Sequence, residues 1–172
     1  MANTETTRST YGGGASWSAA PRIYSMPMVG AGNYDFVNGP IRYREIDVSI
    51  AEMKALVATN KELAPAPGAG FALQFLGGMV IMDYAAAYTE SGNNLAINYT
   101  GAAGAVASEV VEGTGLWDAT SDQVRHIVPA TVSPVVVVNA ALTLDMQGGS
   151  DIAGTGSPVR IKILYAVHDT GL

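Results

Sequence analysis

Hydrophobic and polar residues alternate along several stretches of the chain after residue 40. The alternation is clearest at 41–47, 71–76, 95–100 and 159–165. Successive side chains of a strand point to opposite faces, so this period of two predicts β-strands with one buried face. Gly77 and Gly78 predict a bulge or bend in a strand that continues to Met82 and is extended by Tyr84. A weaker pattern predicts a strand at 123–128.

One short helix is predicted between the first two strands. Ser49 fits the N-cap position, and Glu52 three residues later completes a capping box. The apolar residues that share one face of this helix are Ile50, Met53, Leu56 and Val57. The pattern ends near Thr59, which gives a helix of two to three turns.

The stretch 135–144 is apolar and rich in β-branched residues, which predicts a further strand. Val135 to Val138 is apolar at every position, so both faces of this strand would need cover. A neighbouring subunit, a folded-back arm or an irregular but self-contained core could each provide that cover. Residues 101–112, rich in Ala and Gly, fit either a strand or one or two helical turns.

Turn residues separate these strands, with Pro and Gly at 65–70, Ser-Gly-Asn-Asn at 91–94 and four glycines within 148–156. About seven or eight short strands between such turns are typical of all-β domains. We therefore predict an antiparallel β-sandwich or jelly-roll-like domain over residues 41–172, with one short α-helix.

Residues 1–40 show no sustained period and predict an extended N-terminal arm. They contain Gly12-Gly13-Gly14 and three prolines, but also aromatic residues that a disordered tail would normally lack. Ordering a residue's backbone costs about 1–2 kcal/mol, which burial of the arm's large side chains would only partly offset. The arm is thus expected to order against a neighbour. Its predicted partner-binding residues are Trp17, Tyr24, Tyr34 and Phe36, and the alternative is that they pack on their own subunit.

The composition favours assembly. Charged residues make up 14% of the chain and hydrophobic residues 48%, against about a quarter charged in typical soluble domains. Subunit contacts that cover much of the surface would explain this, although a Gly/Ala-rich monomer is the alternative. The net charge of −6 and scattered basic residues argue against nucleic acid. No membrane partner is expected, because the apolar stretches are too short to span a bilayer, and no secretory signal is recognised.

Residues for catalysis are scarce. Cysteine is absent, and neither His126 nor His168 stands in a metal-binding motif. No nucleophile elbow or phosphate-binding loop occurs. Close acidic pairs, which glycoside hydrolases use, occur at Glu45/Asp47, Glu109/Glu112 and Asp118/Asp122. We expect no enzyme, no catalytic residues, no cofactor and no metal. Two alternatives stay open: a carbohydrate-binding module with Trp117-Asp118 as its aromatic shelf, and a hydrolase with a sparse site, which a substrate screen and mutation of His126 and His168 would expose.

Several segments, in this order along the chain, resemble small virion proteins of tailed bacteriophages. They are Ile50–Leu56, Leu63–Gly70, Tyr88-Thr89-Glu90 before Asn94–Tyr99, Asn139–Leu142 and Val159–Val167. The resemblance covers about residues 41–172 and leaves the arm outside.

This resemblance implies a head decoration (cement) protein without catalytic residues. Such proteins often form trimers on the capsid surface and brace neighbouring major capsid subunits. The expected partners are therefore two further copies, in a homotrimer, and the major capsid protein, and the expected location is the virion. The arm departs from the family pattern, so a tail or neck component, or a carbohydrate- or receptor-binding module of the virion, is the alternative.

Overall fold

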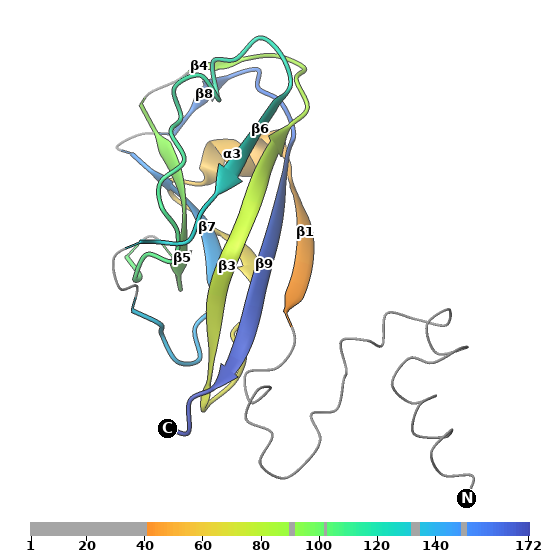
Figure 1. The fold of residues 1–172 in the computed structure, drawn as a ribbon. Coiled ribbons are helices and arrows are strands. Elements are labelled where there is room, and N and C mark those ends of the chain that lie inside the picture. The colour runs from red at the N-terminus through yellow and green to blue at the C-terminus, as the bar shows by residue number, and fades with distance from the viewer. Residues whose placement is uncertain (1–40, 90–91, 102, 132–134, 149–150) are drawn as a thin grey trace, which may run out of the picture.

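The described part of the chain is an antiparallel β-sandwich with one short helix (Figure 1), which confirms the predicted all-β class. The structure is a computed structural model and describes residues 41–89, 92–101, 103–131, 135–148 and 151–172. The predicted arm, with Trp17, Tyr24, Tyr34 and Phe36, lies outside the described residues.

The larger sheet contains four strands in the order β1-β9-β3-β6, all antiparallel. Their bounds are β1 Arg42–Val48, β9 Val159–Asp169, β3 Phe71–Met82 and β6 Gln123–Ile127. The long strands β3 and β9 pair along almost their whole length, whereas β1 and β6 form the two edges. These four strands match the alternating segments of the sequence, except that β3 ends at Met82 and Tyr84 lies in an exposed loop.

The smaller sheet has three strands in the order β2-β7-β5, and a two-stranded pair, β4-β8, closes one end of the molecule (Figure 1). Their bounds are β2 Lys61–Ala64, β7 Leu142–Gln147, β5 Asn94–Tyr99, β4 Tyr88–Thr89 and β8 Ala153–Gly154. Segment 101–112 contains no regular strand or helix in its described residues. It runs beside β5 through two isolated bridges, Asn98 to Val106 and Leu95 to Val111.

The hydrophobic core lies between the two sheets and takes alternate residues from each. The larger sheet contributes Leu73, Val80, Ile161 and Ile163, and the smaller sheet Leu95, Ile97, Leu142 and Leu144, all at most 1% exposed. Burying each such side chain stabilises the fold by about 1.5–3 kcal/mol.

Helix α3 (Ile50–Ala55) begins as predicted. The Ser49 hydroxyl accepts a hydrogen bond from the Glu52 backbone N–H, and the Glu52 carboxylate accepts one from the Ser49 backbone N–H. The helix ends at Ala55, earlier than predicted, because the backbone N–H of both Ala58 and Thr59 bonds the Ala55 carbonyl in a turn. Met53 and Leu56 nevertheless enter the core as expected.

The predicted strand over 135–144 is wrong in its first half. β7 begins only at Leu142, and Val135 and Val136 are 66% and 44% exposed, so no second layer of described residues covers them. Within the part of the chain that the structure describes, the one strand-like contact of this run is an isolated bridge from Val138 to Ala72. The next residue, Asn139, has φ 53°, which ends any extended run, because β-strands require negative φ.

Candidate interaction surface

The outer face of the larger sheet, which points away from the core, carries exposed apolar side chains around Gly77. Strand register places Tyr43, Leu164 and Gly77 side by side across β1, β9 and β3. A second cross-strand row consists of Glu45, Lys162, Met79 and His126. Tyr43 is 55% exposed and Leu164 44%. No other described element covers these residues, so two large apolar side chains face solvent from neighbouring strands.

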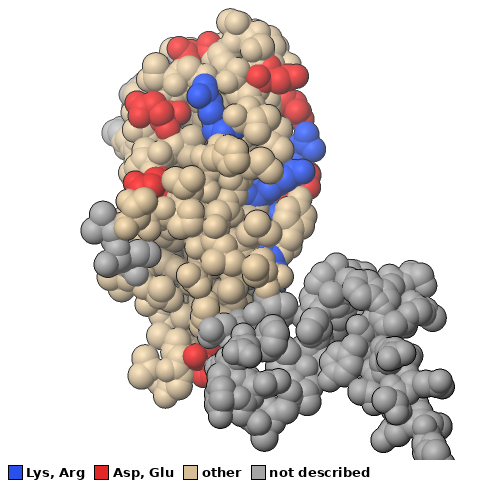
Figure 2. All heavy atoms as spheres, viewed as in Figure 1, with Lys and Arg blue, Asp and Glu red and all other residues tan. Residues whose placement is uncertain are grey.

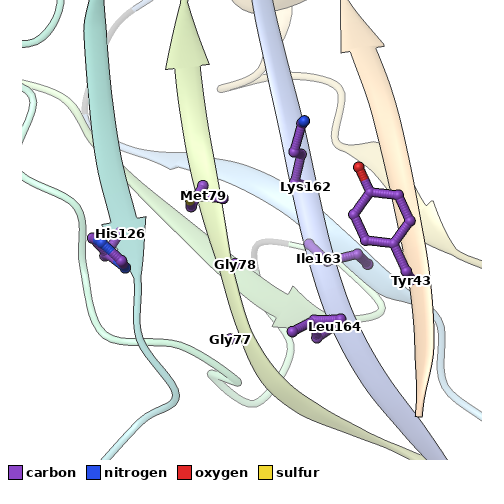
Figure 3. Close-up of a pocket in the computed structure, with 8 residues that line it drawn as sticks. All are labelled: Tyr43, Gly77, Gly78, Met79, His126, Lys162, Ile163 and Leu164. Carbon is purple, nitrogen blue, oxygen red and sulfur yellow. The ribbon is translucent and has the colours of Figure 1, made fainter.

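A groove of about 280 Å³ crosses this face (Figure 3). Its lining residues are Tyr43, Gly77, Gly78, Met79, His126, Lys162, Ile163 and Leu164. In Figure 3, side chains from β1, β9 and β6 surround the backbone of Gly77 and Gly78, which have none. We call this feature the Gly77 groove.

The Gly77 groove results from a β-bulge. The register of β3 against β9 shifts between Phe75 and Gly77, as the paired glycines predicted. Gly77 has φ 142°, a value that residues with a side chain rarely adopt. A Cβ on Gly78 would collide with the backbone carbonyl oxygen of Lys162. The two glycines therefore let β3 bend close to β9, and their missing side chains hollow the outer face.

Charged side chains border this face on one side. Glu45 accepts a hydrogen bond from the Tyr43 hydroxyl at 2.7 Å and forms ion pairs with Lys162 at 3.4 Å and Arg160 at 3.5 Å. The hydrogen bond from Tyr43, followed by Lys162, lowers the pKa of Glu45, and the same bond raises the pKa of Tyr43. Figure 2 shows charged groups gathered toward the top of the view and along β9 and β1, whereas most of the face over β3 is uncharged.

A second apolar surface lies where the chain approaches β7. It consists of Phe71, Val135, Val136 and Val138, which are 41%, 66%, 44% and 36% exposed. The Asn139 backbone N–H donates to the Phe71 carbonyl at 2.7 Å, which holds the valines beside the start of β3. We call this set the valine surface. Contiguous exposed apolar residues of this kind mark interaction sites.

The two histidines do not form a site together. His126 lies on β6 opposite Met79, whereas His168 lies near the end of β9 opposite Ala72. Seven positions of β3 separate these rows, or about 20 Å along the strand. His168 Nε2 is 2.7 Å from the Gln74 side-chain oxygen. Among the described residues, the hydrolase alternative therefore has no site that joins the two imidazoles.

Members of the acidic pairs close loops by accepting backbone hydrogen bonds. Asp118 accepts from the Gly115 N–H at 2.6 Å, Asp122 from the Tyr84 N–H at 2.8 Å and Glu109 from the Thr131 N–H at 2.7 Å. Within the described ranges, no three His, Asp or Glu side chains come close enough together to hold a metal ion.

The carbohydrate shelf predicted at Trp117-Asp118 is wrong. Trp117 is fully buried, and its indole N–H donates to the Asn93 carbonyl at 2.9 Å. Its ring meets Tyr88 edge to face, with centroids 6.1 Å apart. Burial raises the pKa of the Tyr88 hydroxyl to about 12. The indole therefore anchors the β4–β8 end of the core and offers no face to a sugar.

Sequence reasoning missed a buried polar cluster on the smaller sheet. Asp145, 2% exposed, accepts hydrogen bonds from the side-chain amides of Asn60 at 2.8 Å and Asn98 at 3.2 Å. Burial raises the pKa of the Asp145 carboxyl. The three residues come from separate segments of the chain, so no local spacing could have indicated them. Both carboxylate oxygens are occupied by amides, which indicates a structural role.

No family model matches the chain, and no curated protein matches its sequence. A chain of the solved structure "Cyanophage Pam1 capsid asymmetric unit" is similar at a TM-score of 0.45 and 15% sequence identity, over 83% of this chain and 94% of that chain. A likeness at this level carries no conclusion about the role of this chain. Among the described residues, no helix is long and apolar enough to cross a membrane.

Proposed function

We propose that this protein is a structural virion protein that decorates and stabilises a bacteriophage capsid, binding between major capsid subunits as a homotrimer on the capsid surface. The observation that carries this proposal is the valine surface, whose four apolar residues are exposed. The sequence resemblance to small phage virion proteins supports the class of partner. The role requires no chemistry, only contacts.

A decoration protein that forms trimers must bind further copies of itself. We assign the valine surface to this contact, because its four apolar residues are exposed. Each large side chain contributes about 1.5–3 kcal/mol when it is buried in such a contact. Because the trimer presents three arms, its attachment to a lattice is multivalent and stronger than that of one chain.

The arm of residues 1–40 provides the contacts with the shell in this proposal, through the aromatic residues of its outer part, Trp17 and Tyr24. Aromatic residues dominate the energetics of protein interfaces, because they bury large area at little entropic cost. Binding only to the assembled lattice then stabilises the lattice over its dissociated subunits by mass action.

Cosedimentation with capsids that lack this protein tests the proposal. The full chain should sediment with the capsids, and the chain with Trp17→Ala and Tyr24→Ala should bind at least about tenfold more weakly, since each aromatic contact contributes 1 kcal/mol or more. Tyr11→Ala, an aromatic truncation at an unassigned position of the same arm, is the matched control and should bind normally. A full chain that remains in the supernatant, or gold-labelled protein that locates to the tail, would overturn the capsid role.

A further inference from the structure

We infer that the Gly77 groove is the binding site for the last two aromatic residues of the chain's own arm, Tyr34 and Phe36. The groove measures about 280 Å³, roughly twice the ~150 Å³ apolar cavity that holds one benzene ring. It therefore has room for about two rings. Its walls, Leu164, Met79 and Tyr43, offer apolar and aromatic contacts.

The arm begins next to the groove. The described chain starts at Ile41, directly before β1, and Tyr43 on the same strand lines the groove. Five residue steps connect Phe36 to Ile41, and a chain of that length reaches up to about 17 Å. Gly77 lies two strands away from β1, a separation of about 10 Å. Phe36 can therefore reach the groove of its own domain without straining the chain.

The intervening sequence favours a reversal of direction. Asn38-Gly39-Pro40 combines an Asn-Gly pair with a proline, which is a turn signal. A reversal centred at Gly39 brings residues 34–36 level with residues 42–44 of β1, the level of the row formed by Tyr43, Leu164 and Gly77. In an extended segment Tyr34 and Phe36 share one face, while Asp35 between them points away. Both rings can face the sheet while the carboxylate stays in water.

Only residues 37–40 connect Phe36 to the domain. This short tether favours binding to the chain's own groove over binding to the groove of a second copy. A tether this short gives an effective concentration in the millimolar range, far above that of free protein in an assay. Tyr34 and Phe36 then fix where the arm leaves the domain, and Trp17 and Tyr24 remain for the shell. The inference does not depend on the proposed function, since it concerns the isolated protein.

Limited proteolysis with chymotrypsin, which cleaves after aromatic residues, tests this inference on the purified full chain. Cleavage after Tyr34 and Phe36 should be slow relative to cleavage after Tyr11. Leu164→Glu places a charge in the groove and should speed cleavage at both sites about tenfold, because proteolysis tracks the population of the open form. Val110→Glu is the matched control, since Val110 is 45% exposed and Leu164 44%, and it should leave both cleavage rates unchanged.

Repeating the assay at 1 µM and 100 µM distinguishes the chain's own groove from that of another copy. Protection that persists at the low concentration supports the inference, and protection lost on dilution overturns it in favour of a second copy. Equal cleavage in the original chain and the Leu164→Glu chain overturns it outright. Phe36→Asp gives a second test without altering the folded domain, and it should expose the bond after Tyr34. None of these outcomes bears on capsid binding, which is measured separately.

Discussion

At the scale of single residues, the Glu52 carboxylate has partners on both the helix N-cap and a neighbouring strand. It accepts hydrogen bonds from the Ser49 backbone N–H at 2.9 Å and the Ser49 hydroxyl at 2.8 Å, and it also pairs with the Lys61 ammonium. Lys61 first, and then Ser49, lower the pKa of Glu52 to about 2 from its ordinary 4.5. These contacts join the start of α3 to β2.

The lowered pKa predicts how stability depends on pH. Because the folded chain holds a proton on Glu52 less readily than the unfolded chain, this contribution is present above pH 4.5 and is lost as pH falls toward 2. Glu52→Gln should lower the free energy of unfolding at pH 7 by about 1 kcal/mol, a value reduced by solvent screening because the carboxylate is partly exposed. It should also flatten the dependence between pH 4.5 and 2, as measured by urea denaturation.

Glu62→Gln, on the neighbouring strand position of β2, is the control for this measurement. Glu62 is exposed, so its substitution should change the free energy of unfolding by less than about 0.5 kcal/mol. If the two variants lose the same stability and keep the same pH profile, the capping contacts of Glu52 do not contribute as described.

Residues whose partners are close in sequence could be predicted, and those with distant partners could not. The capping box was predictable because Ser49 and Glu52 are three positions apart in a pattern with one mechanism. The contact between Asn60 and Asp145 spans 85 positions, so it exists only once β2 and β7 are paired. Trp117 illustrates the same limit, since its surroundings in sequence resemble a surface loop while the fold buries the ring completely.

At the scale of elements, long strands were predictable and short ones were not. β3 and β9, with 12 and 11 residues, show enough alternation to be recognised. β4 and β8 have two residues each, which is too short for a period to appear. The strand prediction for Val135–Val138 was wrong for a different reason. β-branched residues indicate a strand only where a neighbouring strand offers hydrogen bonds. The sequence does not reveal that, among the described residues, the only such contact there is a bridge to Ala72.

The bulge in β3 gives a prediction at this scale. Gly78→Ala should lower the free energy of unfolding by about 1–3 kcal/mol, as overpacking in a close contact does, because the added Cβ would collide with the Lys162 carbonyl oxygen. Gly171→Ala is the control, since a Cβ there meets nothing within 4 Å although φ is 66°. Thermal unfolding of both variants measures the difference. A smaller loss for Gly78→Ala than for Gly171→Ala would contradict the close approach of β3 and β9.

At the scale of the whole molecule, composition predicted a surface that needs partners, and the described residues leave two sets of apolar side chains exposed. A charged content of 14% says nothing about where apolar groups emerge, because that depends on which strand faces outward and which loop remains uncovered. The Gly77 groove and the valine surface are separate in their lining residues. Each can therefore be disrupted without the other.

Because the two surfaces share no residue, we predict that trimer formation depends on the valine surface only. By sedimentation velocity at micromolar concentration, the full chain should behave as a trimer of the 17.8 kDa subunit. Val136→Glu should shift it to monomer, because three copies of a charge buried at a small apolar contact each cost several kcal/mol. Leu164→Glu, at the same 44% exposure, should leave the trimer intact. If Leu164→Glu dissociates the trimer and Val136→Glu does not, the groove face and not the valine surface is the contact between copies. If the full chain without substitutions is a monomer, trimers form only on the capsid lattice.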